Sequence, residues 1–181
     1  MFLEKKGAFL PFYQGFGLSL DHVEATQKTA IHYALAHLDP KKRTLFVHNT
    51  LTTSEDIQAA HEWSDQVYWA TCPNANLYIE NRLPNYQAFI DNDACMTVGT
   101  DSLTSNWQLS ILEELKTIAR YQSYVPLETL FKWATLNGAK ALGMEETLGS
   151  IEVGKTCGLL VLQGLSSDHQ LVASTTVQRI V

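Results

Sequence analysis

The stretch TLFVHNT (residues 44–50), with its two counterparts VYWATCPNAN (67–76) and CMTVGTDS (95–102), decides the fold of this chain. Each begins with a short run rich in β-branched, aromatic and other apolar residues and ends in polar residues. The runs start at intervals of roughly 30 residues, about the length of a strand–crossover–strand unit. Because parallel strands need a long crossover connection, this spacing favours parallel pairing. The sequence therefore predicts an α/β fold with a parallel sheet or barrel.

Helix signals lie between and before these runs. Residues 26–38 have apolar residues at helical spacing. The predicted inward face of that helix consists of Ala30, Ile31, Ala34 and Leu38. After the first run, Thr52 and Glu55 form a possible capping box for a helix that extends through Trp63. These helices are the expected crossovers and flanks of the sheet.

Further signals follow the second and third runs. Residues 72–76 are interpreted as a loop, because proline and asparagine favour turns. The apolar face of the longer helix after the third run holds Leu112, Leu115, Ile118 and Ala119. Pro126 opens another helix, and Thr135 or Asn137 is placed to cap a last helix that stops at Gly143. We expect a barrel-like part over residues 1–143.

The chain changes character after that point. Residues 144–181 contain glycine-punctuated β-type runs, LLVL (159–162) and TTV (175–177). They predict a small β appendage that is separate from the parallel sheet.

Composition narrows the class of protein. With 181 residues, 45% hydrophobic and 18% charged, the chain is typical of soluble globular proteins, and we expect a cytoplasmic location without a signal peptide. A net charge of −6 disfavours a nucleic-acid partner, and no apolar run is long enough to cross a membrane. Cys72, Cys95 and Cys157 lack the close spacings of zinc or redox motifs, so we expect reduced thiols.

Asp101 and His48 are the candidate catalytic residues. Asp101 follows an apolar run and Gly99-Thr100, where a carboxylate can bind a cation or move a proton. The alternative is that Asp101 caps the next helix. His48 also ends an apolar run, and imidazole can bind metal, carry a proton or donate to an oxyanion. A purely structural histidine is the alternative there.

Asn74 and Asn76 are candidate substrate-binding residues. Their side-chain amides can either hold a loop or grip a polar substrate. In parallel sheets the carboxyl ends of the strands meet at one edge. We therefore expect His48 and Asp101 at the same edge of the sheet, with the Asn74 segment between them.

Five motifs carry a resemblance to a known family. In chain order they are LFVHNT (45–50), CPNANLYIENRLP (72–84), VGTDSLTSN (98–106), WATLNGAKALGM (133–144) and LGSIEVGK (148–155). In this order and spacing they resemble amidohydrolases of the cytosine deaminase, chlorohydrolase and adenosylhomocysteine deaminase group. The resemblance covers residues 40–162. It implies a (β/α)8 TIM barrel, here the last three strands and helices, with a C-terminal piece of a small β-sandwich.

The resemblance also implies a chemistry. The family hydrolyses C–N or C–Cl bonds of heterocyclic or nucleoside-like small molecules, so the implied activity is that of a deaminase with one divalent metal, zinc or iron. Asp101 would bind the metal and take a proton from water, and His48 would hydrogen-bond the attacking oxygen or the substrate. The family's HxH pair and its further metal-binding histidine have no counterpart in this sequence. We therefore expect a fragment that lacks the upstream metal histidines.

Two other interpretations remain open. The chain is alternatively a catalytically inactive fragment or pseudo-enzyme that acts as a binding or assembly module. A small flavodoxin-like domain would also explain parallel strands, although not the order of the motifs. Because a sheet cut from a barrel exposes its edges, the expected partners are the missing upstream half of the barrel or further copies of this chain.

Overall fold

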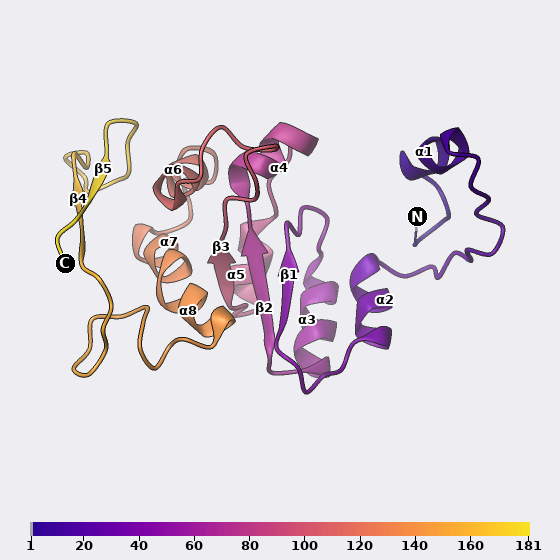
Figure 1. Ribbon diagram of the computed structural model, residues 1–181, viewed down its shortest axis with the longest axis horizontal. Helices are drawn as coiled ribbons and strands as arrows, with labels where there is room; N and C mark the ends of the chain where they lie inside the picture. Colours follow the sequence, from indigo (N-terminus) through magenta and orange to yellow (C-terminus); the bar gives the residue numbers. More distant parts are fainter. Residues whose placement is uncertain (1) are drawn as a thin grey trace.

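The computed structural model describes residues 2–181. In chain order, the elements are α1 (Phe9–Gly15), α2 (Ala30–His37), β1 (Thr44–Val47), α3 (Ser54–Trp63), β2 (Val67–Thr71), α4 (Pro73–Glu80), α5 (Tyr86–Asp91), β3 (Met96–Val98), α6 (Ile111–Tyr121), α7 (Leu127–Ala134), α8 (Leu136–Leu142), β4 (Leu160–Gln163) and β5 (Thr176–Arg179). Figure 1 shows α1 set apart at one end and the β4–β5 hairpin at the other. Among residues 2–181, no helix combines the length and apolar character that crossing a membrane requires.

The three predicted strands form one parallel sheet in the order β1-β2-β3. Phe46 pairs with Trp69, and Trp69 pairs with Met96, so these three side chains lie in one row across the sheet. The strands are consecutive in sequence and adjacent in space, with helices as their crossovers. The predicted α/β fold with a parallel sheet is confirmed.

One face of the sheet packs against helices and forms the core. Trp69 and Met96 are fully buried, and they belong to one apolar cluster with Ile57 of α3 and Phe89 of α5. The Trp69 ring centroid lies 5.1 Å from that of Phe46 and 5.4 Å from that of Phe89. Burial of such side chains is worth about 1.5–3 kcal/mol each, so this face holds the sheet and its crossovers together.

The opposite face of the sheet is partly open. Leu45 and Val47 of β1 point to that face and remain 39% and 48% exposed. A cavity of about 630 Å³ adjoins it, and its lining includes Leu45, Ala70, Leu142 and Leu160. Parallel sheets are normally covered on both faces, so an exposed apolar face is unusual for such a sheet.

Two helix predictions need correction. Thr53 and Asp56, rather than Thr52 and Glu55, form the capping box of α3, because the chain enters the helix one residue later. Residues 73–76 are not a loop. They form the first turn of α4, since Pro73 occupies N1, where a missing N–H costs no intrahelical hydrogen bond.

The inward face of α2 also differs from prediction. The helix starts at Ala30, later than expected, and both Ala30 and Leu38 are exposed. Ile31 packs against the core as predicted, and Leu35, which was not predicted, packs beside it. Thr29 and His32 bond the buried Asp56 carboxylate, which ties α2 to α3 and sets this orientation.

The downstream elements follow the predicted signals. Leu115 and Ile118 of α6 are buried, and Leu112 and Ala119 pack beside them. Pro126 is the N-cap of α7, and Gly143 ends α8 with a left-handed backbone, φ 69°. Strands β4 and β5 form an antiparallel pair that is not part of the three-stranded sheet.

Truncation of the two faces should have unequal effects. We expect Met96→Ala to lower the free energy of unfolding by about 2–5 kcal/mol, because it leaves a cavity under the helices. Leu45→Ala, on the open face, should lower it by less than about 1 kcal/mol, because that side chain loses little burial. Urea unfolding of the two variants, at protein concentrations low enough to keep the chain monomeric, checks this. Equal losses in the monomer would contradict the exposure of Leu45.

Candidate functional site

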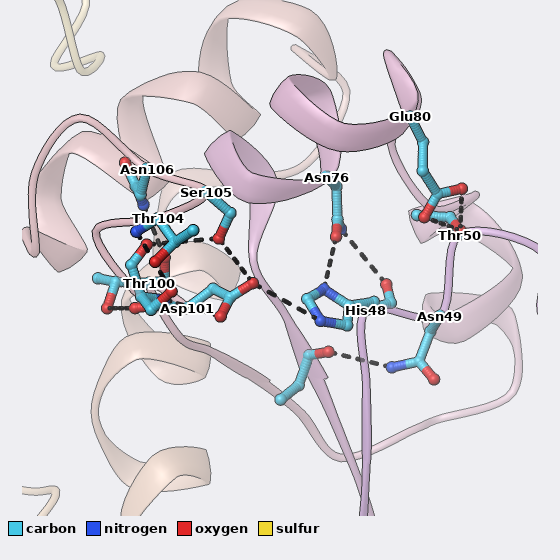
Figure 2. A network of polar contacts seen from close by, with 12 residues as sticks. His48, Asn49, Thr50, Asn76, Glu80, Thr100, Asp101, Thr104, Ser105 and Asn106 are labelled. Carbon is cyan, nitrogen blue, oxygen red and sulfur yellow. Dashed lines mark hydrogen bonds and ion pairs between the residues drawn. The ribbon is translucent and has the colours of Figure 1, made fainter. Parts of the chain in front are cut away.

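The carboxyl edge of the sheet brings two predicted residues together. His48 directly follows β1, and Asp101 lies three residues beyond β3. Figure 2 shows their side chains facing one another, with His48 Nε2 3.8 Å from Asp101 Oδ2. Both side chains keep access to solvent, at 40% and 30% exposure. The predicted placement of the pair at one edge of a parallel sheet is therefore confirmed.

The end of β1 is fixed by hydrogen bonds. The His48 backbone N–H donates to the Ala70 carbonyl, so the ladder continues one residue beyond the strand. Asn49 Nδ2 donates to the carbonyls of Phe46 and Ala70, both at 3.0 Å. His48, Asn49 and Asp101 all have positive φ, at 73°, 59° and 56°, a conformation that costs free energy in non-glycine residues. The surrounding hydrogen bonds hold the strand ends in it.

Asn76 determines which ring nitrogen of His48 carries hydrogen. Its Nδ2 faces the His48 carbonyl oxygen at 3.4 Å, and its Oδ1 lies 2.8 Å from His48 Nδ1. Because an amide oxygen only accepts, His48 Nδ1 must donate to it. In the neutral ring Nε2 is then an unprotonated acceptor, and it points toward Asp101.

Asp101 is held as a carboxylate by its own loop. Ser105 Oγ donates to Oδ2 at 2.9 Å, and the Ser102 N–H donates to Oδ1 at 2.7 Å. These bonds, the one from Ser105 first, hold the pKa of Asp101 below its ordinary value. The alternative of a helix cap does not apply, because Ser110 caps α6.

Asn74 points elsewhere. It is buried, its Nδ2 donates to Glu114 Oε1 at 3.0 Å, and its Oδ1 accepts from Thr117 Oγ1 at 2.6 Å. Both ends of the side-chain amide are thus used inside the protein, between α4 and α6. The structure brings Asn76, but not Asn74, to the His48–Asp101 pair.

Sequence reasoning missed Glu114 and Asn49. Glu114 is fully buried on α6, and desolvation raises the pKa of its carboxyl against the lowering effect of hydrogen bonds from Asn74 and Asn106. Its spacing from Ile118 is the signal that was available, because a glutamate at i−4 from a core residue lies on the apolar face. Asn49 gave no comparable signal, since its partners are backbone carbonyls.

Cys72 is the residue in this region that acts only by packing. The side chain is buried at the end of β2, and burial raises the pKa of its thiol to about 11. A thiol that stays protonated is a poor nucleophile. Cys72 is therefore not a candidate nucleophile at this edge.

Relatives with sequence similarity are deaminases. An adenosine deaminase of Helicobacter pylori is 32% identical over 160 residues, which cover 86% of this chain and 38% of that protein. A 5′-deoxyadenosine deaminase of Methanobrevibacter smithii is 31% identical over 116 residues, 60% of this chain and 27% of that protein. The chain thus spans well under half the length of these relatives.

Solved structures with a similar fold also include deaminases. The aminofutalosine deaminase of Helicobacter pylori in complex with methylthio-coformycin has a TM-score of 0.68 at 30% identity, over 85% of this chain and 38% of that one. The family profile described as the amidohydrolase family matches residues 16–178. The resemblance found in the sequence motifs is confirmed, and this chain belongs to the amidohydrolase family.

Proposed function

We propose that this chain contributes the His48–Asp101 part of the active site of a metal-dependent deaminase that acts on adenosine-like nucleosides. The observation that carries the proposal is the facing of an imidazole nitrogen and a carboxylate at the edge of the sheet. His48 Nε2 lies 3.8 Å from an Asp101 oxygen, while Asn76 Oδ1 accepts from the other ring nitrogen, Nδ1. Deamination by water requires protons to be moved, and an imidazole beside a carboxylate can accept and return them.

Each residue has a distinct proposed role. Asp101 accepts a proton from the attacking water and is one metal ligand. His48 accepts or returns a proton through Nε2, or bonds the attacking oxygen. Asn76 orients the His48 ring, because its Oδ1 accepts from His48 Nδ1. The names of the relatives favour C–N over C–Cl cleavage and a purine nucleoside over other heterocycles.

The described residues do not complete a metal site by themselves. His48 and Asp101 offer one nitrogen and one oxygen donor, and residues 2–181 contain no group of three His, Cys, Asp or Glu side chains arranged to hold a metal. Catalytic zinc sites use three protein ligands. A zinc or iron ion bound to Asp101 would need further ligands from outside these residues. An adenosine deaminase of Xanthomonas campestris, 31% identical, was crystallised with bound zinc.

We propose the same family architecture for the fold. Residues 1–143 would be the last three strands and helices of a (β/α)8 barrel, and residues 144–181 a piece of a β-sandwich. The sheet order β1-β2-β3 supports this, because consecutive strands are neighbours around a barrel. A flavodoxin-like sheet would instead reverse its strand order at a switch point, and none lies within these three strands.

The open face of the sheet supports a polypeptide partner. Leu45 and Val47 are exposed on an edge strand, and an uncovered parallel edge presents unpaired backbone groups. We propose that a further parallel strand pairs with β1, either from another polypeptide or from a second copy. The second candidate function, a non-catalytic assembly module, is favoured by the same surface and by the two-donor site.

Activity should depend on Asp101. The experiment uses the chain purified together with the polypeptides that bind it in its source. In that assembly we expect Asp101→Ala to slow deamination of adenosine or 5′-deoxyadenosine by about 10²-fold or more, because a positioned proton acceptor is lost. Ammonia release measures the rate. Asp65→Ala, which removes an exposed carboxylate, is the matched control. Full activity in the Asp101 variant, or no nucleoside deamination by the wild-type assembly, would contradict the proposal.

The chain alone should bind zinc weakly. We expect less than one equivalent to remain bound after dialysis, because two donors do not hold zinc as three or four do. Metal analysis and side-chain NMR of the histidines check this, and the perturbed ring should be His48. One tightly bound equivalent would show that the described residues complete a site.

Association should follow from the open edge. At micromolar concentration we expect the purified chain to sediment as oligomers or aggregates, because the β1 edge and its apolar face lack cover. Val47→Lys should shift the distribution toward monomer, since a charged edge strand resists pairing. A stable wild-type monomer would overturn the proposal of a missing neighbour.

A further inference from the structure

Glu114 is a buried carboxylate whose partners are all N–H groups. It is 0% exposed, and within residues 2–181 its hydrogen bonds come from the Asn74 backbone N–H at 2.8 Å, Asn74 Nδ2 at 3.0 Å and Asn106 Nδ2 at 2.6 Å. None of the ion pairs within those residues involves it. Burying a carboxylate without a cation is costly unless several hydrogen-bond donors converge on it. The burial of Glu114 therefore depends on these three N–H groups.

The first donor group is the N-terminus of α4. Cys72, the N-cap, makes no side-chain cap, and Pro73 has no N–H. The Asn74 N–H is therefore an unpaired helix-end donor, and Glu114 Oε2 accepts from it. The positive end of the helix dipole favours a carboxylate there. Glu114 thus caps α4 from another helix, forty positions along the chain.

The second donor group belongs to the loop between β3 and α6. Asn106 Nδ2 donates to Glu114 Oε1 and also to the Thr100 carbonyl oxygen, at 2.7 Å. Thr100 immediately precedes Asp101. Figure 2 shows Asn106, Thr100 and Asp101 side by side on this loop. Through Asn106 and Thr100, the Glu114 carboxylate therefore helps to fix the position of Asp101.

The two connections lead to the two facing side chains. Helix α4 carries Asn76, whose Oδ1 accepts from His48 Nδ1, and the loop carries Asp101. One buried carboxylate consequently holds both supports of the His48–Asp101 pair. No other side chain in residues 2–181 hydrogen-bonds both the N-terminus of α4 and the β3–α6 loop.

We propose that Glu114 is a positioning residue that sets the separation and orientation of His48 and Asp101 by clamping α4 and the β3–α6 loop together. Its effect on catalysis rests on the function proposed above, whereas its effect on geometry does not. Asn74 and Asn106 act as the two arms of this clamp. Asn74 then has a role in the site, although its side chain does not contact His48 or Asp101.

Glu114→Gln tests the clamp with little change of shape. The substituted side chain would keep one acceptor oxygen, but its NH₂ group must face either the Asn74 backbone N–H or the Nδ2 groups of Asn74 and Asn106, so at least one of the three hydrogen bonds is lost. In ¹⁵N NMR spectra of the whole chain, we expect the His48 Nδ1–H signal to broaden or vanish and the Ser102 amide, which bonds Asp101, to shift. The Trp69 indole signal should not move, because it reports the core. Glu113→Gln is the control, since it removes the neighbouring charge on the same helix, where the carboxylate pairs with Lys116 at 2.7 Å.

A second variant covers the case in which Glu114→Gln does not fold. Asn106→Ala removes only the loop arm, so the Ser102 amide should shift while the His48 Nδ1–H signal persists. If neither signal changes in the folded variant, the clamp is wrong. In the active assembly, Glu114→Gln should lower kcat by about 10²-fold with little change in KM, as misplacement of catalytic groups does. Altered spectra with a wild-type assembly that deaminates nothing would retain the clamp and reject the proposed function.

Discussion

The parallel pairing of β1, β2 and β3 is the constraint on which the rest of this structure depends. It brings the carboxyl ends of three strands to one edge, so residues as far apart in sequence as His48 and Asp101 face one another. Register matters as much as direction. With a shift of one residue, Phe46 and Met96 would leave the helix-covered face, and the buried row through Trp69 would be lost. The core on one face therefore fixes the geometry of the edge.

A buried polar network carries this geometry from the strands to the loops. Glu114, Asn74, Asn106 and Asn76 are all at most 7% exposed, and each is hydrogen-bonded. Apolar packing alone would allow α4 and the β3–α6 loop to slide, because it has little directional preference. Hydrogen bonds at defined angles remove that freedom, and in a site of low dielectric an unpaired member is costly. This is why an amide-rich segment lies under the candidate site.

Local patterns were sufficient to predict the strands, α6–α8 and the edge where His48 and Asp101 meet. They failed where the partner is distant in sequence. Proline and asparagine in the segment at Asn74 favour a loop, whereas the N-terminus of α4 is stabilised by the distant Glu114, and Pro73 at N1 is a weak local sign of a helix. The roles of Asn74 and Asn76 differ for the same reason: one side chain reaches α6 and the other reaches His48. The predicted capping box of α3 lies one residue too early in the chain, because Thr52 and Thr53 are chemically alike.

The open face and the incomplete donor set have a common physical origin. Within residues 2–181 no strand pairs with the outer edge of β1, where Leu45 and Val47 are exposed, and no group of three metal-binding side chains forms at His48. A strand added in parallel to β1 would cover backbone groups at that edge. Because parallel strands end at the same edge, it would also bring its own carboxyl-end residues next to His48. The proposed partner strand would thus complete the sheet and extend the site in one step, whereas an antiparallel strand would cover the edge and leave the donor set unchanged.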